Sequence, residues 1–344
     1  MNPYALSVII SSLALGTITA LSSFHWVFAW VGLEINTLAI IPLMTKNPHP
    51  RTIEAATKYF LTQAAASALI LFSTTLNAWL LGEWSINSSI NPASSILLSI
   101  AIATKLGVAP FHFWLPEVLQ GVPLKTGLIL STWQKIAPMT LLLQFPQSLN
   151  LNLMLILGLL STLIGGWGGI NQVQIRKILA FSSIAHLGWM IAILKINPQL
   201  TLLNFILYIA MTSTLFLMFM SIDTKNILQL STAWSKAPAI ATLSLLSLLS
   251  LSGLPPLTGF LPKWLIAQEL IKQDLTMFAF LILLSTLLSL FFYLRLTYTV
   301  SLTLAPNTTN SISLWLFKKK NVLSIPALFT LCLLPLSPPL LSLL

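Results

Sequence analysis

Residues 105–116, KLGVAPFHFWLP, and residues 252–263, SGLPPLTGFLPK, interrupt two long apolar stretches of this chain in the same way. With Gly107 placed opposite Gly253, an offset of 146 residues, both follow the pattern G-x-x-P-x-x-x-[WF]-L-P. Proline lacks an amide hydrogen and clashes with the preceding helical turn, so each stretch is predicted to unwind at this pattern. The residues expected at the two breaks are Gly107, Pro110, Gly253, Pro255 and Pro256. Two unrelated proline kinks are the alternative, but the shared spacing and a nearby lysine argue against it.

The composition around these breaks is that of a membrane protein. Of the 344 residues, 56% are hydrophobic and 7% are charged, whereas soluble domains carry roughly 25% charged residues. The formal charge of +10 is spread between apolar runs, which does not indicate nucleic-acid binding. The single cysteine, Cys332, excludes an internal disulfide, a thiolate metal cluster and a CxxC pair.

Apolar runs between polar or proline-containing segments predict an all-α polytopic protein with about eleven transmembrane helices. The expected spans are 3–21, 24–44, 55–81, 92–120, 123–144, 150–170, 174–195, 200–220, 238–271, 275–299 and 322–343.

The basic residues between these spans predict the topology. Eleven lie on the side of the N-terminus, and only Lys195 and Lys272 lie on the other side. Because positive loops stay on the side of synthesis, the N-terminus is expected there and the C-terminus opposite. The eleven are Lys46, Arg51, Lys58, Lys125, Arg176, Lys177, Lys225, Lys236, Lys318, Lys319 and Lys320.

The broken spans are the fourth and the ninth, which predicts two five-helix repeats. Residues 1–144 would form the first repeat and residues 150–299 the second, leaving 300–344 as a basic loop and a final helix. Because each repeat has an odd number of spans, the second copy must start on the opposite face of the membrane. Inverted repeats with discontinuous helices are typical of ion and solute transporters.

Four ionisable residues within the spans are the candidates for function: Glu34, Lys105, Lys135 and Lys263. A buried charge is costly unless it is paired, hydrated or neutralised. A lysine removed from water can release its proton, because desolvation disfavours the ammonium. Glu34 can hold Lys105 charged when the two lie close together, and separation favours proton release. This is the physics of a proton relay, although structural ion pairs or stems that reach the headgroups are the alternatives.

Other polar residues are weaker candidates. His112 and His186 are expected to pass protons or bind water, or, for His112, to cap exposed carbonyls. Arg295 is interpreted as an anchor at the headgroups, and Glu117 with Lys125 as a surface pair. No nucleotide, metal or redox motif is present, so the chain is expected to bind no cofactor and to move ions without transferring electrons.

Several stretches resemble one family: WVGLEINTLAIIPLM, ATKYFLTQAAASALIL, LSTWQKIAP, RKILAFSSIAHLGWM and the two broken segments. They are similar to the antiporter-like membrane subunits of NADH:ubiquinone oxidoreductase, respiratory complex I, and the resemblance spans nearly the whole chain. Family members usually have fourteen helices with breaks in the seventh and twelfth, so this chain resembles a form without the first three. The family's glutamate falls on Glu34, and its three lysines fall on Lys105, Lys135 and Lys263.

The resemblance implies a non-redox, proton-translocating subunit of the mitochondrial inner membrane, with the N-terminus in the matrix and the C-terminus in the intermembrane space. FMN, iron–sulfur clusters and ubiquinone would belong to the complex as a whole. The expected partners are neighbouring membrane-arm subunits and lipids such as cardiolipin. A free-standing cation/proton antiporter is the first alternative, and a scaffold whose buried charges only fix packing is the second.

Overall fold

The computed structural model describes residues 2–302, except for the side chains of residues 235 and 236. Within this range the chain is helical, and seven helices are long and apolar enough to cross a membrane. The predicted span 322–343, the cluster Lys318–Lys320 and Cys332 lie outside the described residues. The chain divides into two compact units: the first runs to Ser161 and includes Leu194–Pro198, and the second comprises Thr162–Ile193 and the chain from Gln199 onward.

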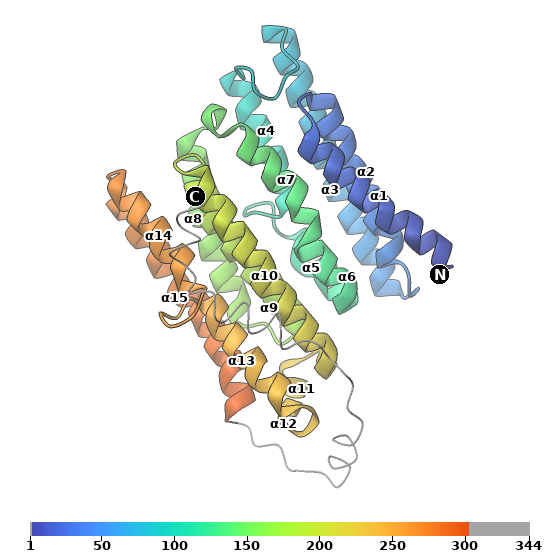
Figure 1. The fold of residues 1–344 in the computed structure, drawn as a ribbon, viewed down its shortest axis with the longest axis vertical. Helices are drawn as coiled ribbons and strands as arrows, with labels where there is room; N and C mark the ends of the chain where they lie inside the picture. The colour runs from blue at the N-terminus through green and yellow to red at the C-terminus, as the bar shows by residue number, and fades with distance from the viewer. Residues whose placement is uncertain (1, 303–344) are drawn as a thin grey trace. The chain divides into compact units, whose positions relative to one another are not determined.

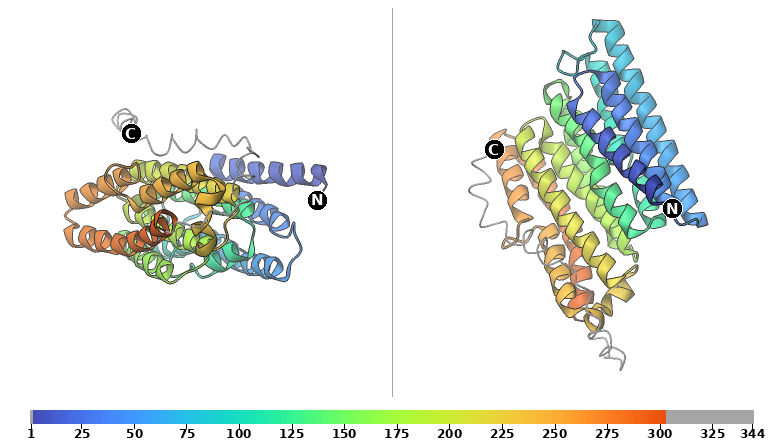
Figure 2. Two further views of the ribbon diagram at one scale, coloured as in Figure 1. Left: turned by 90° about the horizontal axis from the view of Figure 1, so that it is seen from below. Right: turned by 45° about the vertical axis from the view of Figure 1, so that its right-hand side comes forward.

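The first unit starts with three antiparallel helices, which pack side by side (Figures 1 and 2). Gly16 and Gly32 allow α1 and α2 to approach closely, because a Cβ on Gly32 would lie 2.7 Å from the Ala20 amide nitrogen. The helices of this unit are α1 (Pro3–Ser22), α2 (Trp26–Met44), α3 (Pro50–Leu81), α4 (Pro92–Leu106), α5 (Trp114–Gly121), α6 (Leu124–Ser131), α7 (Trp133–Gln144), the 3₁₀ turn η1 (Pro146–Ser148) and the start of α8 (Leu151–Ile170).

Proline and a polar cap define several helix starts. Asn2, His49 and Asn91 each precede a proline at the first helical position and accept a hydrogen bond from the backbone at helical position two. Proline fits there because its missing donor would be unpaired in any case. The His49 cap starts α3 five residues before the predicted boundary at residue 55.

Helix α4 ends at Leu106, and α5 begins only at Trp114. Gly107 adopts the left-handed conformation with φ 76°, and its amide donates to the carbonyls of Ala103 and Thr104. Leu115 lies only 2.9 Å from where a Gly107 Cβ would stand, so both the backbone and the space favour glycine.

The second unit contains the same kind of interruption. Helix α13 ends at Ser252, Gly253 has φ 82°, and α14 begins at Phe260. The Gly253 amide donates to the carbonyls of Leu249 and Ser250. The helices of this unit are the end of α8, α9 (Ile175–Leu194), α10 (Pro198–Ile222), α11 (Ile227–Ser231), α12 (Ala233–Lys236), α13 (Pro238–Ser252), α14 (Phe260–Lys272) and α15 (Thr276–Ser301).

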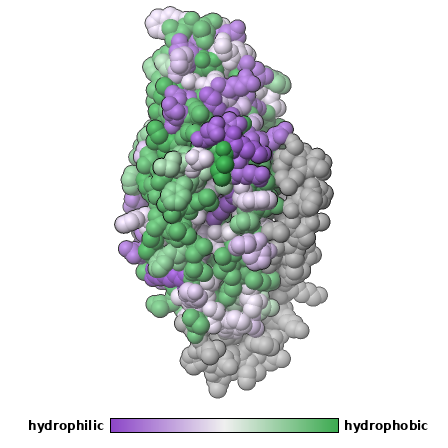
Figure 3. Space-filling model, turned by 90° about the vertical axis from the view of Figure 1, so that its left-hand side faces the viewer, coloured by the Kyte–Doolittle hydropathy of each residue, from purple (hydrophilic) through white to green (hydrophobic). Residues whose placement is uncertain are grey.

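Within the described part of the chain, each unit also contains one antiparallel β-bridge between two loops. In the first unit His25 pairs with Ser85, and in the second Gln174 pairs with Asn226. The outer surface is apolar over much of the face drawn in Figure 3, with hydrophilic patches between. Exposed apolar side chains on α15 include Met277, Phe280 and Phe291, as expected of a surface that lies in lipid or against other chains.

Candidate functional site

Glu34 and Lys105 form an ion pair inside the first unit. Glu34 is in the middle of α2, and Lys105 is in the last turn of α4. Lys105 Nζ lies 3.9 Å from Glu34 Oε2, and the side chains are 1% and 26% exposed respectively. At an effective dielectric of about 20, two unit charges at this distance attract by about 4 kcal/mol. Lys105 Nζ makes no hydrogen bond within the described residues, so the pair is held by attraction without a fixed hydrogen-bond geometry.

A small cavity of about 10 Å³ is lined by both Lys105 and Lys135. Its volume is at the lower limit for one water molecule. The cavity is lined by Leu33, Asn36, Thr37, Tyr59, Gln63, Lys105, Leu106, Trp114, Leu130, Gln134, Lys135 and Pro138.

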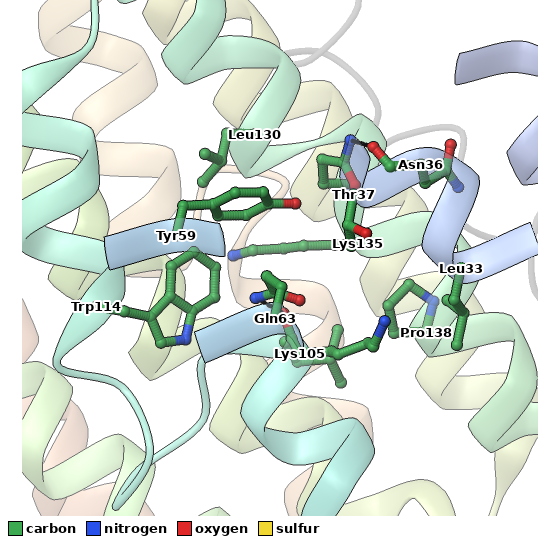
Figure 4. Close-up of a pocket in the computed structure, with 12 residues that line it drawn as sticks. Leu33, Asn36, Thr37, Tyr59, Gln63, Lys105, Trp114, Leu130, Lys135 and Pro138 are labelled. Atoms are coloured by element: carbon green, nitrogen blue, oxygen red, sulfur yellow. Dashed lines mark hydrogen bonds between the residues drawn. The ribbon is translucent and has the colours of Figure 1, made fainter. Parts of the chain in front are cut away.

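The two lysines enter this cavity from different helices and point to different parts of it. Lys135, on α7, is 3% exposed, and its side chain extends past Tyr59 toward Trp114 (Figure 4). The amino group of Lys105 points toward Pro138 instead (Figure 4). Passing a proton between them therefore requires a side-chain rearrangement or an intervening water molecule.

The elements around the cavity are held by side-chain bonds to backbone carbonyls. The Trp114 indole donates to the Thr104 carbonyl at 3.1 Å, so this carbonyl at the end of α4 accepts from both the indole and the Gly107 amide. Gln134 Nε2 donates to the Asn36 carbonyl at 3.0 Å and links α7 to α2. Gln63 Nε2 approaches the Lys105 carbonyl at 3.5 Å. These contacts fix the backbone that carries both lysines.

Lys263 lies in the second unit and folds back over the break between α13 and α14. Its Nζ donates to the Ser252 carbonyl at 2.7 Å, at the last residue of α13. Its Cδ and Nζ lie 2.9 Å from where a Gly253 Cβ would stand. A cation at the C-terminus of a helix is favoured both by the unpaired carbonyls and by the helix dipole.

The two histidines occupy different surroundings. His112 lies in the segment between α4 and α5, is 4% exposed, and contacts the Phe113 ring. His186, on α9, is 7% exposed, with its ring centroid 5.8 Å from that of Tyr208. Ser182 and Ser183, one turn earlier, are also buried, so His186 belongs to a buried polar cluster of the second unit.

The structure brings Glu34, Lys105 and Lys135 together in the first unit, whereas Lys263 and His186 lie in the second. Tyr59, Gln63 and Trp114 also line the cavity, which was not predicted from the sequence. Tyr59 and Gln63 are four residues apart on α3 and therefore share one helix face. This spacing is visible in the stretch ATKYFLTQAAASALIL.

An exposed ion cluster lies near one end of this unit. Lys58 Nζ contacts Glu54 Oε1 at 2.6 Å and Glu117 Oε2 at 2.7 Å. Glu117 therefore pairs with Lys58 on α3, not with Lys125, the partner that the sequence suggested. Arg295 Nη1 donates to the Ile170 carbonyl at the end of α8 at 2.7 Å, a contact that was not predicted from the sequence. No group of three or more His, Cys, Asp or Glu side chains suited to a metal occurs among the described residues.

Comparison with known families first defines a class. Residues 23–289 match the family model for the transmembrane region of NADH:quinone oxidoreductase and Mrp antiporter subunits. Residues 290–341 match the model for the NADH dehydrogenase subunit 2 C-terminus. The class is therefore that of antiporter-like membrane subunits.

Individual relatives narrow the class. The chain is 61% identical to NADH-ubiquinone oxidoreductase chain 2 of Aquarana catesbeiana, with 100% of both chains covered. It is also 61% identical to the protein of that name from Xenopus laevis, over 98% of this chain and 99% of that one. The chain belongs to the NADH-ubiquinone oxidoreductase chain 2 family.

Solved structures share its fold. A chain of respiratory complex I from Thermus thermophilus with bound aureothin is 27% identical and has a TM-score of 0.87, covering 99% of this chain and 80% of that one. A chain of the Mrp complex from Dietzia sp. DQ12-45-1b is 18% identical, with a TM-score of 0.80 over 97% and 75% of the two chains, and is similar in fold alone.

Proposed function

We propose that this chain is a proton-translocating membrane-arm subunit of respiratory complex I, in which Glu34, Lys105, Lys135 and Lys263 form a proton relay. The observation that carries the proposal is the ion pair of Glu34 and Lys105, placed beside the small cavity that Lys105 shares with Lys135. The family membership supports the complex as its setting.

The relay works by changing the distance between charges. With Glu34 at 3.9 Å, Lys105 is favoured in its protonated form. Doubling that distance halves the attraction to about 2 kcal/mol at the same effective dielectric. Lys105 can then pass a proton across the cavity to neutral Lys135, through one water molecule or a rotamer change. Lys263 would continue the path in the second unit, with His112 and His186 as further hydration or transfer points.

An inverted five-helix repeat is part of this proposal, and matched local geometry in the two units supports it. In the first unit the Trp26 amide donates to the Trp84 carbonyl, and the Ile86 amide donates to the Phe24 carbonyl. In the second, the Ile175 amide donates to the Lys225 carbonyl and the Ile227 amide to the Val173 carbonyl.

The first bridge joins the loop between spans one and two to the loop between spans three and four. The second bridge joins the loop between spans six and seven to the loop between spans eight and nine, so the two bridges occupy corresponding positions in the proposed repeats. The interruptions match as well, because α4 and α13 end in left-handed Gly107 and Gly253, followed by helices that start at Trp114 and Phe260. We therefore read α4 with α5, and α13 with α14, as the two discontinuous helices among eleven spans.

The location and energy source follow from the same proposal. The subunit would span the mitochondrial inner membrane, with its N-terminus in the matrix, and would contact neighbouring membrane-arm subunits and lipids such as cardiolipin. The redox reaction from NADH to ubiquinone, with FMN and iron–sulfur clusters, would proceed in other subunits. This chain would contribute proton transfer alone.

A free-standing cation/proton antiporter is the second candidate, since the chain shares its fold with a chain of the Mrp complex. Independent antiport requires a cation site. Glu34 offers the one carboxylate well inside a predicted span, since Glu117 and Glu269 lie near span ends, and it pairs with Lys105. The geometry therefore favours the complex subunit.

Native electrophoresis tests the setting, and mutation tests the relay. Detergent-solubilised membranes should contain this chain in a large band that oxidises NADH, identified by mass spectrometry. Its presence only in a small particle without that activity would favour the free-standing antiporter.

In assembled complex, Lys135→Met should lower proton-coupled turnover by about tenfold or more, because a relay loses a proton acceptor. An unchanged proton yield per NADH and an unchanged rate would leave a scaffold role instead.

A further inference from the structure

The Lys58 cluster lies where helix α5 packs against the start of α3. Lys58 bridges Glu54, one turn earlier on α3, and Glu117 on α5. The side chains of Lys58 and Glu117 are 42% and 52% exposed. The bond to Glu54 stays within one helix, so the bond to Glu117 is the one that joins the two elements.

Helices α3 and α5 make a ladder of three antiparallel contacts. Toward the cavity, the Tyr59 and Trp114 rings meet edge-on at 5.6 Å. Next comes the pair of Lys58 and Glu117. Beyond it, Gly121 packs so closely that a Cβ would lie 2.6 Å from the Ala55 Cβ and 2.7 Å from the Arg51 carbonyl.

The two rings of this ladder line the lysine cavity. Tyr59 and Trp114 both line it and are 2% and 7% exposed. Lys58 precedes Tyr59 directly, and Glu117 follows Trp114 by three residues, so each charge of the ion pair is on the backbone that carries one ring. We call these two rings the aromatic lid.

We propose that Lys58 and Glu117 are positioning residues that hold the aromatic lid shut and thereby control access of water to Lys105 and Lys135. A functional role for such control rests on the proposed proton relay, whereas the contact between the two rings is independent of it. Among the contacts of α5, the indole bond to Thr104 and the Gly121 contact are buried or tightly packed. The ion pair is the contact that solvent and salt reach, so it is the contact that can be released.

Cysteine labelling in the assembled complex tests the lid directly. Leu130, which lines the cavity and is 1% exposed, is replaced by Cys in a Cys332→Ser background, and a small membrane-impermeant thiol reagent is added. Glu117→Gln and Lys58→Met should each raise the labelling rate by about 1.4- to fivefold, the range expected for loss of an exposed ion pair. Glu83→Gln is the matched control, because Glu83 is exposed and bonds only Ser85 among the described residues.

A charge swap separates positioning from general packing. Lys58→Glu combined with Glu117→Lys should return the labelling rate to that of the parent. Labelling that stays at the parental rate in Glu117→Gln, or that stays high in the swap, would overturn the proposal. Proton pumping does not enter this readout, so a failure of the relay would be seen separately, as an unchanged proton yield in Lys135→Met.

A second measurement needs no variant and covers the case in which the variants do not assemble. Hydrogen–deuterium exchange of residues 114–121 in the natural complex should speed up at about 1 M salt, where the Debye length falls to about 3 Å. Residues 133–144 serve as the internal comparison, because Lys135 is the only charged side chain among them and it is buried. Equal effects on both segments would contradict an ionic hold on α5.

Discussion

Lys105 and Lys263 lie on opposite sides of two matching helix breaks. Lys105 precedes Gly107 by two residues, whereas Lys263 follows Gly253 by ten. At the offset that aligns the breaks, Leu251 stands where the first unit has Lys105, and Glu117 stands where the second has Lys263. The lysine near the first break therefore lies beside the Glu34 carboxylate, and the lysine near the second break donates to a carbonyl at the end of a helix. The attraction between Lys105 and Glu34 changes with the distance between them. The position of Lys263 depends instead on the backbone between α13 and α14, because its amino group is bonded to the Ser252 carbonyl.

Glu34→Gln tests the switch at Lys105. Removing the charge eliminates the attraction of about 4 kcal/mol that favours protonated Lys105. Proton-coupled NADH oxidation by the assembled complex should fall by about tenfold or more if each cycle depends on that protonation. Glu269→Gln is the control, because Glu269 is similarly accessible and pairs with the exposed Lys272 in the second unit. Equal rates for both variants would argue against a working pair at Glu34.

Gly253→Ala tests the cap at Lys263, with Gly82→Ala as its matched control. Both glycines have positive φ, 82° and 73°, so alanine strains the backbone by about 1–2 kcal/mol at either site. No atom lies within 4 Å of a Gly82 Cβ, whereas Lys263 lies 2.9 Å from a Gly253 Cβ. Gly253→Ala should therefore lower turnover as well as thermal stability of the complex, and Gly82→Ala should lower stability alone. The same loss of turnover in both would remove Lys263 from the explanation.

The sequence was sufficient to predict which residues belong to the candidate site, but not which residues contact each other. Glu34, Lys105, Lys135 and Lys263 stand out because a charge in an apolar span is costly. The partner of Lys58 could not be predicted, because Glu117 is 59 residues away and only the packing of α5 on α3 brings them together. The bond from Lys263 to the Ser252 carbonyl could not be predicted for a similar reason, since it depends on how α14 turns back after the break.

At the scale of elements, the hydropathy of the sequence predicted the bounds of several helices closely but did not predict one interruption, in the span 123–144. The predicted spans 150–170 and 275–299 correspond to α8 and α15 within two residues. The predicted span 123–144 is instead divided into α6 and α7 at Thr132. Pro138 gives a physical reason for irregularity here, since it cannot donate to the Gln134 carbonyl one turn earlier. That irregularity lies just before Lys135, so the same proline shapes the helix that presents this lysine.

Arg295 tests how one helix stabilises another. Its guanidinium donates from α15 to the last carbonyl of α8, at Ile170. Arg295→Met should destabilise the subunit by about 1.5–3 kcal/mol, the range for a hydrogen bond to a charged group. Arg295→Lys, which keeps a donor and a charge, should recover part of that loss. The yield of assembled complex on native gels and its thermal inactivation measure the effect. A full yield and unchanged inactivation of Arg295→Met would favour an anchor in the headgroups.

At the scale of the whole molecule, the charges between the helices predict an orientation that the fold alone does not give. Eleven basic residues against two favour the N-terminal side as the side of synthesis, which would be the matrix. Asn47 lies between α2 and α3, and Ser88 lies between α3 and α4, so the single helix α3 separates them. Both side chains are accessible to reagents, since Asn47 is exposed and Ser88 is partly exposed.

Single cysteines at these two positions therefore read the topology directly. In a Cys332→Ser background, Asn47→Cys should react with an impermeant maleimide only in inside-out inner-membrane vesicles. Ser88→Cys should react only in mitoplasts, where the opposite face is open. Detergent-opened membranes provide the total labelling for each variant. The reversed pattern would place the N-terminus in the intermembrane space and, with it, the Lys58–Glu117 pair. The aromatic lid would then control access to the lysines from the side that receives protons, and the direction of the proposed relay would have to be inverted.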